Sequence, residues 1–98
     1  MITCTKKTNG KMNAYKLTFE DGRTYESNFK KNFAYAVVFN AQGGSYPGQW
    51  MLQGYASDLP KAQKTVSRCK SMWSARRRGR YYSPAVPVTV KIIEVTAA

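Results

Sequence analysis

The chain has 98 residues, which is enough for one compact domain and too few for two. Hydrophobic residues make up 43% of it and aromatic residues 13%, so it can bury a core and is not a disordered polybasic tail. With 16 Lys and Arg residues against 5 acidic ones, the formal charge is +11, which produces a field that attracts polyanions.

Neither membrane insertion nor secretion is indicated by the sequence. The longest apolar run covers residues 33–39 and is far shorter than a membrane span. The first residues have a strand-like pattern rather than the apolar segment of a signal peptide. We therefore expect a cytoplasmic protein with no membrane partner. Cys4 and Cys69 are expected to be buried, reduced thiols, because two cysteines do not make a disulfide framework.

Two turn signals organise the first part of the chain into a three-stranded meander. The dipeptide Asn9-Gly10 favours a two-residue type I′ turn, which pairs Cys4 with Tyr15. At the second signal, residues 20–22, a three-residue loop with Gly22 in the left-handed region pairs Leu17 with Tyr25. The predicted apolar face of the meander consists of Ile2, Cys4, Tyr15, Leu17, Phe19 and Tyr25.

Two further strands are predicted before the only helix. Residues 33–40 alternate bulky and small apolar side chains without a charge, which is typical of a central strand covered on both faces. Residues 42–48 are dense in turn formers and predict a loop. Residues 49–56 predict a fifth strand in which Trp50, Leu52 and Gly54 share a face.

The helix is expected to begin after Ser57 or Asp58, either of which can cap it, with Pro60 in its first turn. Its apolar stripe is Leu59, Ala62, Val66, Cys69 and Trp73, and Gly79 and Pro84 mark the end of the helical pattern.

The last predicted strand covers residues 86–95. Its apolar set shifts phase at Ile93, which indicates either a bulge or a second buried face. The predicted fold class is α+β: one domain over residues 1–98, ordered βββββ-α-β. One amphipathic helix packs across a mostly antiparallel sheet of five to six strands.

The most informative stretch for function lies between Leu59 and Ile93, which contains no acidic residue. On the predicted helix, basic side chains stand opposite the apolar stripe. Three of them form a column whose spacing matches successive backbone phosphates in scale, with the fourth to one side. These four candidate binding residues are Lys61, Lys64, Arg68 and Lys70. A solvated helix face is the alternative, but such faces normally carry Glu as well as Lys.

The segment directly after the helix is the strongest candidate site. It combines guanidinium groups, which bind phosphate in a bidentate way, with rings on which unpaired bases stack. Its candidate binding residues are Arg76, Arg77, Arg78, Arg80, Tyr81 and Tyr82. Cations at a helix C-terminus also favour the helix dipole, which explains one or two of these arginines but not four.

Two weaker candidates remain. One is a set of lysines at the hairpin and strand ends, which we interpret mainly as protection of sheet edges: Lys6, Lys7, Lys11, Lys30 and Lys31. The other is the loop of residues 43–50, which can either form an aromatic docking ledge or fold back so that Tyr46 and Trp50 complete the core.

Enzymatic chemistry is poorly supported. The sequence has no histidine, the usual general base and the commonest metal ligand, so we expect no metal and no cofactor. The five acidic residues show no spacing that suggests a catalytic pair. A metal-independent ribonuclease of the kind found in toxin systems, which uses Lys, Arg and Tyr in place of His, stays open as an alternative. The order of elements in this chain does not resemble that of those ribonucleases.

These observations lead to two hypotheses on function. The first is a non-enzymatic domain that grips the backbone of RNA or DNA, with RNA or single strands slightly favoured. The second is a small inhibitor or adaptor of the phage or mobile-element type, whose basic surface binds an acidic surface of a host protein such as a nuclease. The sequence leaves the oligomeric state open.

Overall fold

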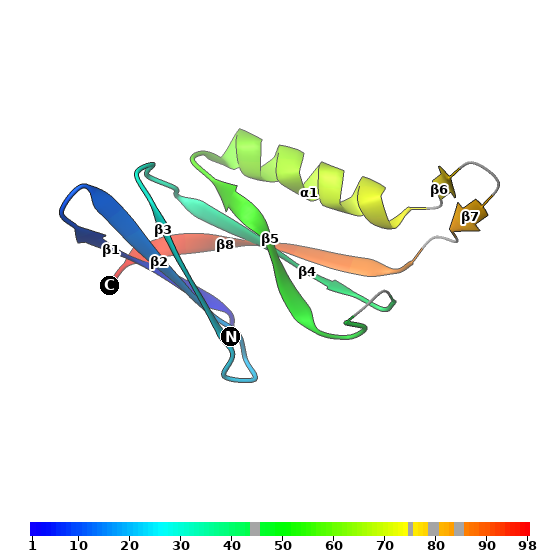
Figure 1. Cartoon of the computed structure of the whole chain (residues 1–98), viewed down its shortest axis with the longest axis horizontal. Coiled ribbons are helices and arrows are strands. Elements are labelled where there is room, and N and C mark those ends of the chain that lie inside the picture. Colours follow the sequence, from blue (N-terminus) through cyan, green and yellow to red (C-terminus); the bar gives the residue numbers. More distant parts are fainter. Residues whose placement is uncertain (44–45, 75, 79–80, 84–85) are drawn as a thin grey trace.

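The computed structural model describes residues 1–43, 46–74, 76–78, 81–83 and 86–98, with the backbone alone for residues 76–78 and 81–83. A curled sheet carries one helix across it, so the predicted α+β fold is confirmed (Figure 1). The elements in chain order are β1 (Thr3–Asn9), β2 (Met12–Thr18), β3 (Thr24–Phe29), β4 (Tyr35–Ala41), β5 (Trp50–Ala56), α1 (Leu59–Trp73), β6 (Arg76–Arg78), β7 (Tyr81–Ser83) and β8 (Val88–Ala97).

The large sheet has six strands in the order β3-β2-β1-β8-β4-β5. All neighbours are antiparallel except β1 and β8, which run parallel with Cys4 opposite Val95. The last strand therefore lies between the meander and the β4–β5 pair and joins them into one sheet. The short strands β6 and β7 form a separate two-stranded pair that the sequence did not predict.

The predicted register of the first hairpin is wrong, because the turn lies one residue later in the chain than predicted. The two loop residues are Gly10 and Lys11, so Asn9 pairs with Met12 and Cys4 with Leu17. Gly10 has φ of +64°, and no non-glycine residue of the described chain has a positive φ. A type I′ turn at Asn9-Gly10 would need a positive φ at both positions. The pattern here is that of a type II′ turn, whose first position glycine occupies without strain.

The second turn is as predicted. Gly22 has φ of +90°, and its N–H donates a hydrogen bond to the Phe19 carbonyl oxygen over 3.0 Å. The three-residue loop pairs Leu17 with Tyr25. Because the error in the first turn moves the pairing by an even number of residues, it leaves every side chain on its predicted face. The predicted apolar face of the meander is accordingly buried, with Tyr25 partly so.

The core consists of two clusters on opposite faces of the sheet. Inside the curl lie Ile2, Cys4, Leu17, Phe19, Ala36 and Val38, surrounded by Tyr25, Trp50, Leu52, Tyr55, Ile93 and Val95. Beneath the helix lie Val37, Ala56 and Ala62, with Tyr35, Val66, Val90 and Ile92. Strands β4 and β8 thus contribute to both clusters. The phase shift in the last strand therefore reflects a second buried face, and the ladder from β8 to β4 continues without a bulge.

A bulge occurs instead in β5. Val37 pairs with Gly54 and Val38 with Leu52, so Gln53 is the extra residue. One inserted residue reverses the side of the sheet on which later residues stand. The prediction that Gly54 shares a face with Trp50 and Leu52 is therefore wrong, because Gly54 lies on the face that the helix covers.

Helix α1 begins as predicted. The Asp58 side chain caps it by accepting a hydrogen bond from the Lys61 N–H over 2.8 Å, and Pro60 lies in the first turn. The helix packs across β8, β4 and β5 (Figure 1). It ends at Trp73, earlier than the predicted end at Gly79, because Ser74 has an extended backbone and residues 76–78 already lie in β6. Gly79 and Pro84 themselves lie outside the described residues. Cys4 and Cys69 are free and buried, as predicted. In the described part of the chain, no helix has the length and hydropathy needed to cross a bilayer.

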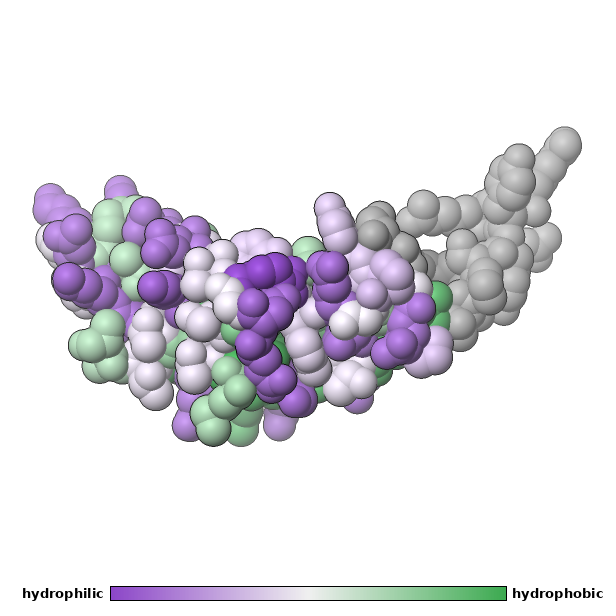
Figure 2. All heavy atoms as spheres, turned by 90° about the horizontal axis from the view of Figure 1, so that it is seen from below, coloured by the Kyte–Doolittle hydropathy of each residue, from purple (hydrophilic) through white to green (hydrophobic). Residues whose placement is uncertain are grey.

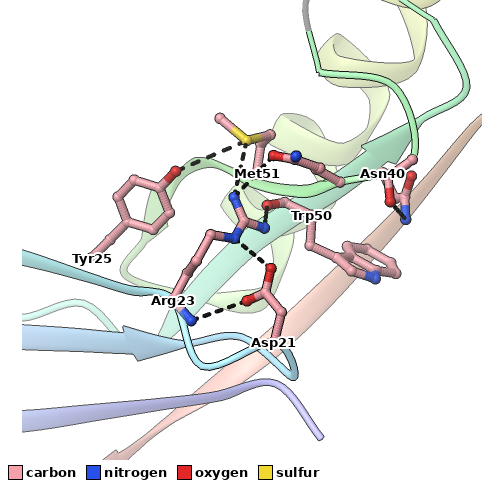
Figure 3. Close-up of polar contacts among 8 residues, drawn as sticks. Asp21, Arg23, Tyr25, Asn40, Trp50 and Met51 are labelled. Atoms are coloured by element: carbon pink, nitrogen blue, oxygen red, sulfur yellow. Dashed lines mark hydrogen bonds and ion pairs between the residues drawn. The ribbon is translucent and has the colours of Figure 1, made fainter.

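The curl brings the two edge strands, β3 and β5, into side-chain contact. Arg23, in the β2–β3 loop, donates hydrogen bonds to the Trp50 carbonyl oxygen over 2.7 Å and to Gln49 Oε1 over 3.4 Å (Figure 3). Farther along the same edges, the Phe29 and Tyr55 rings meet with centroids 5.6 Å apart. Side chains rather than a backbone ladder therefore close the curl around the inner cluster.

Candidate nucleic-acid interface

The four basic residues predicted for the helix face all lie on the solvent side of α1. Lys61, Lys64, Arg68 and Lys70 are exposed. On the opposite side of the helix, Ala62 and Cys69 are fully buried against the sheet. The helix thus packs against the sheet through its apolar stripe, and the basic side chains take no part in this packing.

One of the four basic residues, Lys61, interacts with side chains at the N-terminal cap of the helix. Lys61 Nζ lies 3.9 Å from Asp58 Oδ2 and donates to Ser57 Oγ over 3.3 Å. Lys64 and Arg68 are not in any of the three ion pairs recorded among the described residues. They stand one helical turn apart, about 6 Å along the axis. Lys70 lies in the last turn, where a cation also stabilises the helix dipole.

The Arg-Tyr segment begins just beyond the end of α1. Its backbone forms the β6–β7 pair, in which Arg77 is opposite Tyr82 and Arg78 opposite Tyr81. For this segment the structure gives the backbone of Arg76, Arg77, Arg78, Tyr81 and Tyr82, while Arg80 lies outside the described residues. The two leading candidate sites, the helix face and this segment, are therefore adjacent in space as well as in sequence (Figure 1).

The structure does not bring the lysines of the β1–β2 turn to the same place as the helix face and the Arg-Tyr segment. The β1–β2 turn and the β6–β7 pair lie at opposite ends of the longest axis, along which the chain extends 50 Å (Figure 1). Hydrophilic residues gather at the β1–β2 end in Figure 2. Part of the predicted set of hairpin and strand-end lysines has a structural role: Lys6 Nζ donates to Asn32 Oδ1, and the Lys31 carbonyl oxygen accepts from Tyr15 OH over 2.9 Å.

In the loop between β4 and β5, one aromatic residue completes the core and another is exposed, so each of the two interpretations applies to one of them. Trp50 packs against the inner core cluster, and Lys91 Nζ lies 4.8 Å from the centroid of its ring. Tyr46 is 58% exposed. Gly44 and Ser45 lie outside the described residues. Trp50 is thus a core residue, whereas Tyr46 remains accessible to a ligand.

Sequence reasoning missed a cavity at the C-terminal end of α1, with a volume of about 220 Å³. Its lining residues are Phe39, Ala41, Gly43, Tyr46, Met51 and Trp73. They come from β4, the following loop, β5 and the helix, so no local pattern places them together. The one available signal was the clustering of Tyr, Gly and Trp in residues 43–50, for which an aromatic docking ledge was one of the two interpretations.

Burial shifts the pKa of both thiols. Burial raises the pKa of Cys4 to about 11 and also raises the pKa of Cys69. A protonated, buried thiol is a poor nucleophile. Within the residues that the structure describes, no group of three or more Cys, Asp or Glu side chains could hold a metal ion.

The chain was compared with protein-family models, with curated proteins and with solved structures, and none of the three comparisons found a match. Function is therefore inferred from the residues and geometry of this chain alone.

Proposed function

We propose that the chain is a non-enzymatic nucleic-acid-binding domain of the cytoplasm. In this proposal the exposed face of α1 and the segment of residues 76–82 bind the phosphate backbone. The observation that carries it is a continuous basic stretch without acidic residues. Lys64 and Arg68 project from α1 outside the recorded ion pairs, and the helix leads within three residues to Arg76.

The chemistry of the segment favours RNA or single strands over duplex DNA. A guanidinium group binds phosphate through two parallel hydrogen bonds and also stacks on planar groups, which the ammonium of lysine does not do. Tyrosine rings add stacking surfaces for unpaired bases. Phosphate contacts and stacking carry little sequence information, so we expect weak sequence preference.

The test is fluorescence anisotropy with labelled single-stranded RNA, duplex RNA and duplex DNA over a salt series. If about five phosphates are neutralised on duplex DNA, the logarithm of the binding constant falls with the logarithm of the salt concentration with a slope of about −4.5. Replacing Arg76, Arg77 and Arg78 with Ala should flatten that slope by about two to three units while circular dichroism stays unchanged. A wild-type slope near about −1 would exclude this mode of binding.

The same basic surface also fits an acidic surface of a host protein, as in a small phage or mobile-element inhibitor or adaptor. Weak and salt-insensitive binding to all three nucleic acids would favour this alternative. Charge reversal at a single arginine should then dominate the loss of affinity, as at an interface hot spot. On nucleic acid, by contrast, losses at neighbouring arginines should be similar and roughly additive.

A further inference from the structure

Strand β8 has a ladder partner along only part of one side. It pairs with β4 from Val88 to Glu94, but with β1 only through the three residues 95–97. Figure 1 shows β8 passing from beneath α1 to the meander, where β1 joins it. Although β8 lies inside the sheet order, none of its ten described residues is fully buried. Within the described chain, β8 thus has an open edge before Val95.

Hydrogen bonds at the two ends of β8 show which residues face this edge. The Val95 N–H donates to the Ala34 carbonyl oxygen over 2.9 Å, and the Pro87 carbonyl oxygen accepts the Gln42 N–H over 3.0 Å. Both bonds lie on the β4 side, and the ladder between them has no bulge. Because backbone direction alternates along a strand, odd-numbered residues face β4 and even-numbered residues face the open edge. The residues of the open edge are Val88, Val90 and Ile92.

The open edge has the length of a short strand. At its beginning, the Val86 N–H donates to the Trp73 carbonyl oxygen over 2.8 Å, so the end of α1 closes the edge there. At its other end, the ladder to β1 begins. Between these limits there is room for about five residues of extended chain, or about 17 Å. A peptide backbone offers N–H and C=O groups at the spacing of this edge, which a nucleic-acid backbone does not.

Neither of the residues that commonly protect sheet edges blocks this one. Lys91 Nζ lies 4.8 Å from the centroid of the Trp50 ring, and Trp50 belongs to β5, on the far side of β4. The ammonium group is therefore directed across β4, away from the edge. Pro87 removes no donor from the edge, because its nitrogen lies on the β4 side.

The charge around the edge favours an acidic partner. Met72 Sδ accepts a hydrogen bond from Gln53 Nε2 over 3.8 Å, which places that flank of α1 over β5. Lys70, two residues earlier, is exposed and lies about 200° around the helix, on the flank toward β8. The sequence has no acidic residue between Leu59 and Ile93. A second copy of the chain would bring another charge of +11 to this edge and so fits it less well than an acidic segment.

We propose that residues 88–92 bind an extended acidic segment of a partner protein as an additional strand of the sheet. Partner side chains opposite Val88, Val90 and Ile92 share their face of the sheet, which α1 covers, so we expect apolar residues there. The intervening side chains lie on the face of Lys91, where we expect acidic residues. The inference is separate from the proposed function and does not depend on nucleic-acid binding.

The test follows amide hydrogen exchange of the intact chain by NMR, with a short peptide of alternating Glu and Val as the probe. In the free protein, the N–H groups of Val90 and Ile92 should exchange rapidly, whereas that of Lys91, which faces β4, should exchange slowly. With peptide at about ten times its dissociation constant, exchange at Val90 and Ile92 should slow about tenfold. Unchanged rates, or slow exchange in the free protein, overturn the proposal. Slowing that depends on protein concentration alone would assign the edge to a second copy and overturn it as well.

A modified peptide tests the pairing itself. Methylating the backbone nitrogens of one alternate set of peptide residues should abolish binding, and methylating the other set should be tolerated. The reason is that only one set of N–H groups in an added strand faces β8. Equal effects of the two sets overturn strand addition.

A pair of protein variants tests the position of the charge. Lys70→Glu should weaken peptide binding about fivefold. Lys11→Glu reverses the same charge at the exposed β1–β2 turn and should change the affinity little. Equal weakening in the two variants would mean that the peptide responds to net charge rather than to this edge, and would overturn the proposal.

Discussion

Arg23 Nη2 donates a hydrogen bond to the Trp50 carbonyl oxygen over 2.7 Å, and this contact joins the two edges of a six-stranded sheet (Figure 3). The same guanidinium pairs with Asp21 through Nε, 2.6 Å from Oδ2, and lies 5.1 Å from the centroid of the Phe19 ring. Arg23 thus satisfies a backbone acceptor of edge strand β5 that no neighbouring strand can reach. Basic charge here serves the fold, in contrast to Lys64 and Arg68 of α1, which are in none of the recorded ion pairs.

Replacing Arg23 with Ala should lower the free energy of unfolding by about 2 kcal/mol, the range measured for hydrogen bonds that involve a charged group. Chemical denaturation monitored by tryptophan fluorescence measures the change. Arg23→Lys keeps the charge but loses the planar fork, so its stability should lie between those of Ala and wild type. Unchanged stability in Arg23→Ala would show that the two sheet edges do not depend on this contact.

Stability should fall at acidic pH partly through Asp21. The Arg23 backbone N–H, donating to Asp21 Oδ1, and the Arg23 guanidinium lower the pKa of this carboxyl group, although partial desolvation opposes them. A pKa that is lower in the folded state gives stabilisation that is complete above the unfolded pKa and disappears as pH falls through the folded pKa. Denaturation midpoints over a pH series should therefore decline more steeply in wild type than in Asp21→Asn. Parallel curves for the two proteins would contradict this assignment.

The buried hydroxyl of Tyr15 should matter more than that of Tyr55. Tyr15 OH accepts the Phe33 N–H over 2.7 Å and donates to the Lys31 carbonyl oxygen over 2.9 Å. Tyr15→Phe leaves both backbone groups without this partner and should destabilise the fold by about 1–3 kcal/mol. Tyr55 OH is buried and makes no well-formed hydrogen bond among the described residues, although the Ser27 hydroxyl is near enough to oppose the rise in the Tyr55 pKa that burial causes. Tyr55→Phe is therefore the matched control and should change stability little. Equal losses in thermal denaturation would contradict the comparison.

Both thiols should resist modification in the native state. Cys4 is 1% exposed and Cys69 is 0% exposed, and burial holds the pKa of Cys4 at about 11. Reaction with a chromogenic disulfide reagent at mildly alkaline pH should therefore be slow in buffer and should reach two equivalents in concentrated urea. Rapid reaction of one thiol in buffer would show that the core around it opens locally.

The helix face can be tested against a patch of the same charge. On duplex DNA, Lys64→Gln with Arg68→Gln should flatten the salt slope by about two units, because each phosphate contact contributes about 0.9. Lys7→Gln with Lys11→Gln removes the same charge from exposed residues of the β1–β2 hairpin, at the far end of the molecule, and should leave the slope nearly unchanged (Figure 1). Equal effects of the two double variants would mean that binding responds to net charge rather than to α1.

Much of the local structure followed from sequence, because its determinants lie within a few residues of one another. The Gly22 loop fixes the β2–β3 register, and Asp58 with Pro60 fixes the start of α1. The register predicted from Asn9-Gly10 was wrong because the local sequence is compatible with two turns. Glycine can take either position of a two-residue turn, and the two choices preserve the same apolar face. Of the candidate site, the sequence identified the basic stretch and its freedom from acidic residues, which composition alone reveals.

Tertiary structure alone decided which distant segments meet. The parallel pairing of β1 with β8 and the bulge at Gln53 depend on how strands far apart in the chain share one curved sheet, and no local preference encodes that choice. The contact from Arg23 to β5 and the cavity beside Trp73 have the same origin. The sequence by itself therefore determined the elements apart from β6 and β7, most of their buried faces and the basic character of the chain. The curl of the sheet, which brings its edges together, and the docking of α1 determined where the cavity beside Trp73 lies.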